Sequence, residues 1–252
     1  MTDVVGGAAE GYGGAVSDNP VASAMALRTL QSGLPLFLEG GRPVAPKTTA
    51  SRSSQLAIKR AIDLMLCLVA LAGLAPLLVV VALAVKVTSA GPVFYRQARP
   101  GLNGVPFQLL KFRSMHADRC DDGQLQATSD DERVTWVGRI IRATSIDELP
   151  QLWNVLVGEM SLVGPRPMVE GQKAAGQDYR ELVPYYDFRL RMKPGLTGWA
   201  QAHGLRGPTD DAVRAIRRIE HDCAYIQNFS VGLDIRTILK TLHGEFLTGS
   251  GI

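Results

Sequence analysis

An uninterrupted apolar run, Leu64–Val85, dominates the first half of this chain. Its 22 residues include no charged side chain. At about 1.5 Å per residue, a straight helix of this length reaches roughly 33 Å, which is enough to cross a hydrocarbon core of about 30 Å. The sequence therefore predicts a membrane segment, with spanning as the simplest topology.

Two features of this segment favour a second topology. Pro76 lies near its middle, with Gly73 three residues earlier, and a proline inside a helix removes a backbone donor and causes a kink. Basic residues flank both sides, with Lys59 and Arg60 before the run and Lys86 after it, so the positive-inside rule gives no direction. A helix that breaks and returns to the same face fits both features, and the residues alone leave the two topologies open.

Charge and cysteine content exclude some classes of protein. The 27 basic and 24 acidic residues give a net charge of +3, which is too small for a dedicated nucleic-acid binder, so no nucleic-acid partner is expected. The three cysteines are widely spaced and form no Cys-x-x-Cys pair, which indicates a reducing compartment without a disulfide framework.

Composition divides the chain into three parts. Residues 1–52 are rich in Gly, Ala, Ser and Pro, and are expected to be a flexible tail. Residues 53–87 hold the membrane helix, and residues 88–252 form the remaining domain. In that domain, VFYRQ and FQLLKF flank the turn-forming PGLNG and predict a β-hairpin, and VTWVGRIIRAT predicts a helix. The overall fold class is α+β and mainly helical.

The C-terminal helices carry arginines between apolar residues, as in VRAIRRIEHD (213–222). A solvated helix and a basic amphipathic helix on anionic headgroups explain this pattern equally well. The fold prediction includes such amphipathic interfacial helices.

Two adjacent acids, Asp147 and Glu148, follow the predicted helix. Ser145 and Glu148 have the spacing of a capping box, and Pro150 is tolerated in a first turn, so a helix is expected to begin at 145–147. The acids would then lie at the positive end of a helix, where carboxylates and phosphates are both stabilised. On its own the pair is explained by helix capping.

A rigid arginine follows about twenty residues later. Prolines on both sides of Arg166 fix the backbone of GPRP, which lowers the entropy cost of a bidentate grip on phosphate. Arg142, Lys111 and Arg113 are further cations that could meet the two acids. Two carboxylates among several cations suit a Mg²⁺-neutralised diphosphate, and an aspartate can attack phosphorus as a nucleophile.

Six ordered motifs give this chain a family resemblance. They are KRAIDL, GPVFYRQ, RPGLNGVPF, KFRSM, SIDELPQLWNVLVGEMSLVGPRP and KPGLTGWAQ, which begin at Lys59 and run far into the C-terminal domain. With them the chain resembles the bacterial sugar transferases of the monotopic polyprenyl-phosphate phosphoglycosyl transferase family. The N-terminal tail lies outside the resemblance.

The resemblance implies transfer of a sugar 1-phosphate from a UDP-sugar to undecaprenyl phosphate, with release of UMP, at the start of exopolysaccharide or other surface glycan synthesis. UDP-glucose or UDP-galactose is the expected donor, with a UDP-N-acetylhexosamine as the alternative. A non-catalytic membrane scaffold and a glycosyltransferase that releases UDP are the competing functions.

The resemblance also assigns roles to residues. Asp147 would be the nucleophile that carries the phosphosugar, and Glu148 would complete the pair in metal binding or proton transfer, with Mg²⁺ as cofactor. The phosphate and substrate contacts would be Arg166, Arg142, Lys111, Arg113, Lys193 and Gln201.

The resemblance further implies a re-entrant helix broken at Pro76 and pinned by Lys59, Arg60 and Asp63. It places the catalytic domain on the cytoplasmic face of the bacterial inner membrane, in contact with membrane lipid. The oligomeric state is left open, a homo-oligomer included.

Overall fold

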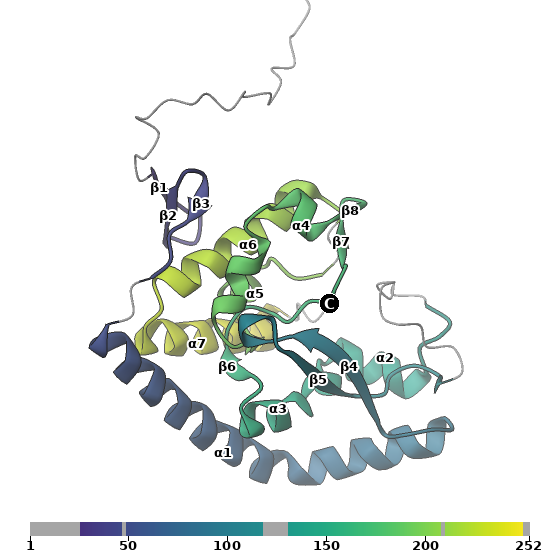
Figure 1. The fold of residues 1–252 in the computed structure, drawn as a ribbon. Helices are drawn as coiled ribbons and strands as arrows, with labels where there is room; N and C mark the ends of the chain where they lie inside the picture. The colour runs from purple at the N-terminus through teal and green to yellow at the C-terminus, as the bar shows by residue number, and fades with distance from the viewer. Residues whose placement is uncertain (1–25, 47–48, 118–130, 208–209, 249–252) are drawn as a thin grey trace, which may run out of the picture.

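The computed structural model describes residues 26–46, 49–117, 131–207 and 210–248. A long helix, α1 (Ala50–Thr88), runs along the underside of the molecule, and the other elements are stacked above it (Figure 1). The helices above it are α2 (Trp136–Ala143), α3 (Gln151–Val157), α4 (Tyr179–Leu182), α5 (Trp199–Ala202), α6 (Ala212–Gln227) and α7 (Val231–Thr248). Short 3₁₀ turns cover Leu102–Gly104, Ile146–Glu148 and Tyr186–Arg191.

In the described part of the chain, the strands form four small sheets. The predicted hairpin is confirmed as β4 (Phe94–Pro100) and β5 (Pro106–Phe112), which pair antiparallel. A parallel pair joins β6 (Ser161–Val163) to β9 (Gly195–Thr197), and an antiparallel pair joins β7 (Lys173–Ala174) to β8 (Gln177–Asp178). The mixture of helices with small sheets agrees with the predicted, mainly helical α+β class.

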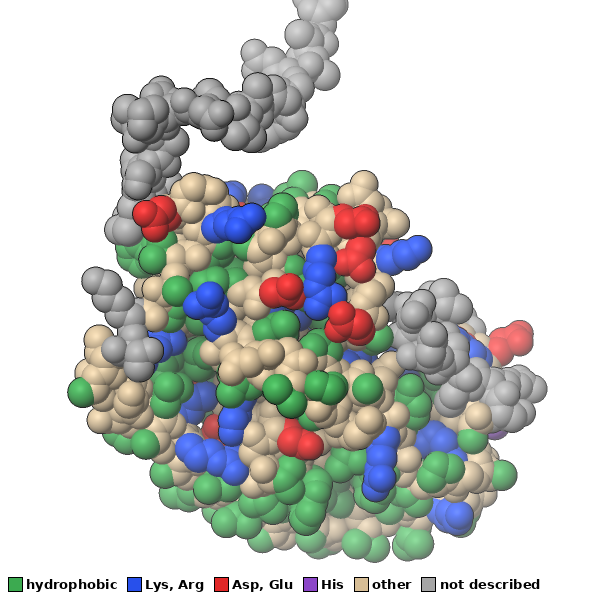
Figure 2. Space-filling model, in the orientation of Figure 1, with side chains coloured by type: hydrophobic (Ala, Val, Ile, Leu, Met, Phe, Trp, Pro, Cys, Tyr) green, Lys and Arg blue, Asp and Glu red, His purple; other side chains and the backbone are tan. Residues whose placement is uncertain are grey.

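The apolar run lies in the C-terminal part of α1 and ends three residues before the helix does. Thr49 caps the helix by accepting from the backbone N–H of Arg52. Among the described residues, α1 is the one helix long and apolar enough to cross a membrane, and 11% of its most apolar 18-residue stretch is buried. Exposed apolar side chains cover the underside along this helix (Figure 2). This surface indicates membrane association.

The helix continues through Pro76 instead of ending there. Proline lacks the N–H that would bond to the carbonyl of Ala72, but the turns on either side keep their own hydrogen bonds. Figure 1 shows α1 bent along its length, so that its two arms follow the rounded underside. The predicted break is therefore corrected to a bend within one continuous helix.

Polar residues near the start of α1 bind the protein itself. The ammonium of Lys59 donates to Asp234 of α7 and to the carbonyl of Val163. The guanidinium of Arg60 donates to carbonyls at the end of α3, and Asp63 accepts from the hydroxyl of Ser161. These bonds fix α1 to α3, β6 and α7. The position of Lys59, Arg60 and Asp63 at the membrane interface stays a prediction.

The expected flexible tail over residues 1–52 is wrong for 26–46. Here β1 (Ala26–Thr29), β2 (Pro35–Glu39) and β3 (Arg42–Pro43) form an antiparallel sheet beside α6. Leu36 is fully buried in the main core, and the side-chain amide of Gln227 bonds to both backbone groups of Phe37. Apolar burial and these bonds hold the segment in place, while residues 1–25 lie outside the described part.

The headgroup-binding hypothesis for residues 213–222 is also corrected. This segment lies in α6, whose residues Arg218–Ile226 are all buried. The guanidiniums of Arg214 and Arg218 donate to backbone carbonyls of the loop 204–207 and are therefore used inside the protein. α7 contacts α1 and exposes Ile235, Leu239 and Leu242, so the expected interfacial helix stays a prediction that α7 fits better.

Candidate active site

The acid pair lies in a short 3₁₀ turn between α2 and α3. Ser145 has a left-handed backbone, with φ of 55°, and its side chain caps no helix, so the expected capping box is wrong. The physical reason is that the Glu148 carboxylate bonds to Lys111 and Arg166 and does not reach back to Ser145. α3 begins only at Gln151.

Glu148 forms the centre of a network of opposite charges. Arg166 binds both of its oxygens in a bidentate grip, and the ammonium of Lys111 lies 2.7 Å from Oε1. Burial alone would raise the pKa of Glu148, but the charges and hydrogen bonds of Arg166 and Lys111 together outweigh burial and hold it well below its usual range. Glu148 is therefore charged at every physiological pH, and its attraction raises the pKa of Arg166.

Asp147 is in a different electrostatic state. It is 7% exposed, and its carboxylate accepts no hydrogen bond from the described residues. The ammonium of Lys111 lies 3.9 Å from its Oδ2. Burial raises its pKa, opposed by the charge of Lys111 and, more weakly, of Arg142 and Arg166. The structure thus places a buried carboxylate with unused lone pairs beside several cations.

The turn that carries Arg166 is held rigidly, as its prolines predicted. Gly164 packs so closely on the loop before β9 that a Cβ there would clash with the carbonyl oxygen of Lys193. The guanidinium of Arg189 donates to the carbonyl of Arg166 and is itself paired with the buried Asp222. The Arg166 side chain therefore projects from a fixed backbone toward Glu148.

Two further arginines near Arg166 were missed by the sequence reasoning. Arg99 donates to the carbonyl of Pro167, and burial together with the charge of Arg166 lowers its pKa to about 10. Burial and the charge of Arg166 also lower the pKa of Arg206. Arg99 stands in the motif RPGLNGVPF, so its place at the hairpin turn was a usable signal. The resulting concentration of positive charge suits a ligand with more than one phosphate.

Other predicted site residues lie elsewhere. Arg113 donates to the carbonyl and hydroxyl of Ser89 at the end of α1, and its phosphate contact stays a prediction. Lys193 lies near Arg60. Its own burial and, as a smaller cause, the charge of Arg60 lower the pKa of Lys193. Gln201 is buried in α5. The structure brings neither Lys193 nor Gln201 into contact with Asp147, and their substrate contacts stay predictions.

The donor set fits a Mg²⁺ ion that is shared with a substrate. Among the described residues there is no cluster of three His, Cys, Asp or Glu side chains that could hold a metal alone. Mg²⁺ is commonly bound by one or two carboxylates together with substrate phosphates. Asp147 offers such a carboxylate, whereas both oxygens of Glu148 are already bonded to Arg166.

The sequence is similar to a known family and to several curated proteins. The family model described as "Bacterial sugar transferase" matches residues 54–247. A Rhizobium leguminosarum protein named "Exopolysaccharide production protein PSS" is 49% identical over 78% of this chain and 98% of its own length. The Escherichia coli "UDP-glucose:undecaprenyl-phosphate glucose-1-phosphate transferase" is 45% identical over 82% of this chain, which matches 44% of that longer protein. An Aeromonas hydrophila "UDP-N-acetylgalactosamine-undecaprenyl-phosphate N-acetylgalactosaminephosphotransferase" is 43% identical over 77% of the chain and 44% of its own length.

Proposed function

Since the chain belongs to the bacterial sugar transferase family, we propose that it transfers glucose 1-phosphate from UDP-glucose to undecaprenyl phosphate and releases UMP, as a first step of exopolysaccharide synthesis. The observation that carries this proposal is the buried Asp147 carboxylate, which accepts no hydrogen bond from the described residues and lies beside a group of cations. A nucleophile must keep a lone pair free, and a diphosphate needs positive charge around it.

Asp147 acts as the nucleophile. A carboxylate oxygen of Asp147 attacks the sugar-linked phosphorus, and the bond from this phosphorus to the bridging oxygen breaks, so that UMP leaves with the bonding electrons. The product on the enzyme is an aspartyl phosphosugar. An oxygen of the lipid phosphate then attacks the same phosphorus and displaces Asp147, which regenerates the carboxylate and forms the lipid diphosphate sugar.

The cations position and stabilise the diphosphate. Glu148 holds Arg166 and Lys111 in one place, so that their remaining N–H groups are oriented before the substrate arrives. Arg99, Arg142 and Arg206 add positive charge around the same position. Glu148 therefore serves mainly as the group that orients the two cations.

Mg²⁺ would be held by Asp147 together with the two substrate phosphates, with Glu148 close by. When bound, it would neutralise negative charge on the diphosphate and so favour the departure of UMP. Lys193 and Gln201 remain proposed contacts to the rest of the substrate.

The membrane placement is also part of the proposal. α1 enters and leaves the cytoplasmic face of the bacterial inner membrane as a re-entrant helix, and residues 88–252 stay in the cytoplasm. The bend in α1, its exposed apolar face and the basic residues on both sides of it support this topology. The free, buried cysteines Cys67 and Cys223 agree with a reducing compartment.

Nucleotide release tests the proposed reaction. We expect the purified protein, given undecaprenyl phosphate and Mg²⁺, to release UMP from UDP-glucose faster than from UDP-galactose, UDP-N-acetylglucosamine or UDP-N-acetylgalactosamine. The N-acetylated donors represent the alternative supported by the Aeromonas relative. Release of UDP would contradict the reaction class, and a faster rate with an N-acetylated donor would correct the sugar.

The rate of UMP release in a single turnover is expected to depend on the ionisation of Asp147. Because the pKa of Asp147 is raised above its ordinary value of 3.8, the rate should fall as the pH drops through this higher pKa. The raised pKa also means that the native state binds this proton more tightly than the unfolded state. The contribution of Asp147 to the free energy of unfolding therefore decreases as the pH rises through the same range, whereas the rate increases.

The measurement is the single-turnover rate without acceptor lipid, at a series of pH values from acidic to neutral. An inflection at or below 3.8 would contradict the burial effect. The exposed-acid variant Asp187→Asn serves as the control and should leave the profile unchanged.

A further inference from the structure

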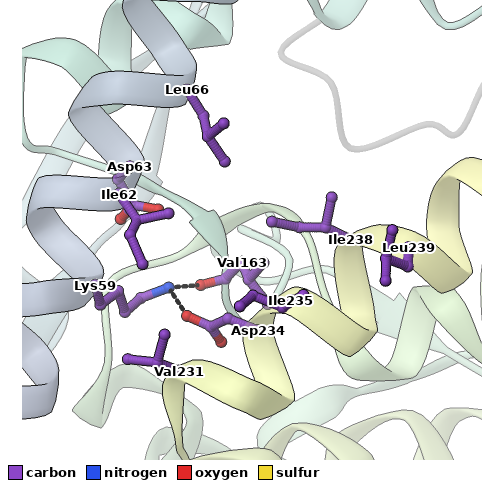
Figure 3. Close-up of a pocket in the computed structure, with 10 residues that line it drawn as sticks. All are labelled: Lys59, Ile62, Asp63, Leu66, Val163, Val231, Asp234, Ile235, Ile238 and Leu239. Atoms are coloured by element: carbon purple, nitrogen blue, oxygen red, sulfur yellow. Dashed lines mark hydrogen bonds and ion pairs between the residues drawn. The ribbon is translucent and has the colours of Figure 1, made fainter.

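A cavity opens between α1 and α7, beside the rigid turn that carries Arg166. Its volume is about 120 Å³. Ile62 and Leu66 enter it from α1, and aliphatic side chains of α7 face them across the gap (Figure 3). The lining residues are Lys59, Ile62, Asp63, Leu66, Val163, Val231, Asp234, Ile235, Ile238 and Leu239.

The polar side chains of this cavity are already used. Lys59 and Asp234 form a buried ion pair with an N–O distance of 2.6 Å, and Asp234 also accepts from the hydroxyl of Tyr225. Asp63 accepts from the hydroxyl of Ser161 and the backbone N–H of Leu162. A polar ligand would therefore gain few hydrogen bonds here, and the aliphatic walls favour a hydrocarbon.

The cavity is continuous with the apolar surface of the membrane helix. Leu66, Ile235 and Leu239, which line it, are 37%, 47% and 61% exposed, and Met65, which precedes Leu66 in α1, is exposed as well. A ligand from water would have to pass this apolar surface, whereas a lipid chain already lies in it. The volume is also well below the roughly 300–1,000 Å³ of typical small-molecule pockets, and so fits a short length of chain.

The cavity is linked to the proposed reaction centre through β6 and the turn that follows it. Val163 lines it, and Arg166, three residues further on, binds Glu148. Three residues span at most about 11 Å. A lipid whose phosphate lies near Arg166 could therefore place its first hydrocarbon units between α1 and α7.

We propose that the cavity between α1 and α7 binds the isoprene units next to the phosphate of the acceptor lipid. This inference rests on the proposed function, because it takes the acceptor to be a polyprenyl phosphate. The Lys59–Asp234 pair lies beside Val163 of β6, and the exposed Leu66, Ile235 and Leu239 form the apolar side of the cavity. The lipid chain would thus be guided to the reaction centre along the membrane helix.

Filling the cavity from either wall tests the proposal. We expect Ile235→Trp and Leu66→Trp to raise the KM for undecaprenyl phosphate at least about tenfold, which corresponds to losing the burial of about two methylene groups. The KM for UDP-glucose and the single-turnover release of UMP without lipid should stay within about twofold of wild type. Farnesyl phosphate, which has the same first isoprene units, should show the same loss.

The matched control is Val213→Trp on α6. Val213 is 54% exposed, close to the 47% of Ile235, but does not line the cavity. It should leave every constant unchanged. Single-turnover UMP release also reports folding, and Ile235→Phe provides a smaller substitution if the tryptophan variant does not fold.

Each outcome decides between the alternatives. An unchanged KM for undecaprenyl phosphate in both cavity variants would overturn the lipid site. This holds even if the variants change phospholipid binding or the oligomeric state. Equal losses in UMP release and in the lipid step would mean a general structural defect and would also overturn it. If the wild-type protein released no UMP, the proposed function itself would fail.

Discussion

Asp147→Asn is expected to lower the single-turnover rate of UMP release by at least about a thousandfold. The amide has almost the same shape as the carboxylate but lacks the negative oxygen that must attack phosphorus. Since Asp147 accepts no hydrogen bond from the described residues, the substitution removes only its 3.9 Å ion pair with Lys111 from the described part. The protein should therefore fold and bind UDP-glucose while failing in chemistry.

The decisive measurement combines rate and adduct. The wild-type protein, incubated with UDP-glucose without lipid, should gain the mass of one glucose phosphate, and the Asn variant should not. Glu148→Gln is an informative comparison, because it weakens the orientation of Arg166 and Lys111 but keeps the nucleophile. It should slow the reaction and still form the adduct. An Asn variant that retained more than a few per cent of the rate would remove Asp147 from the nucleophile role.

The meeting of Glu148 with Arg166 could be predicted because it depends on local rules. Prolines on both sides restrict the backbone of Arg166, and a buried carboxylate needs a cationic partner. Lys111 also fits such rules, because it lies within β5 and reaches the acid pair. Arg113, two residues after Lys111 in the same motif, does not follow these rules, because β5 ends at Phe112. Beyond the strand the alternation of faces no longer applies, and Arg113 turns to the end of α1.

The N-terminal sheet was missed because composition was averaged over fifty residues. Within that stretch, the segment 26–43 has the turn-forming SGLP and EGGR between short apolar runs, which is a hairpin signal. In α6 the pattern of arginines was read correctly, but a pattern does not say what the arginines bind. Backbone carbonyls of the loop just before α6 took the place expected for lipid headgroups, and contacts of this kind are not visible in a periodicity.

Asp222→Ala is expected to lower the free energy of unfolding by about 3–5 kcal/mol. Arg189 and Asp222 form an ion pair whose side chains are 2% and 3% exposed, and the substitution leaves the guanidinium buried without its counter-charge. For a chain of this size the melting temperature should fall by roughly 6–20 °C. The control is Glu170→Ala, which removes an exposed partner of Arg180 and should cost no more than about 1 kcal/mol. Thermal unfolding of the protein in detergent measures both.

Removing both charges separates the structural role of the pair from its role at the active site. Buried ion pairs replaced by apolar residues of similar size often regain stability, so Arg189→Met combined with Asp222→Leu should recover most of the melting temperature. The rate of UMP release should not recover, because Arg189 also donates to the carbonyl of Arg166 and no methionine can do so. If the double variant regained both, the pair would contribute to stability alone. If it stayed as unstable as Asp222→Ala, the loss would come from packing and not from the uncompensated charge.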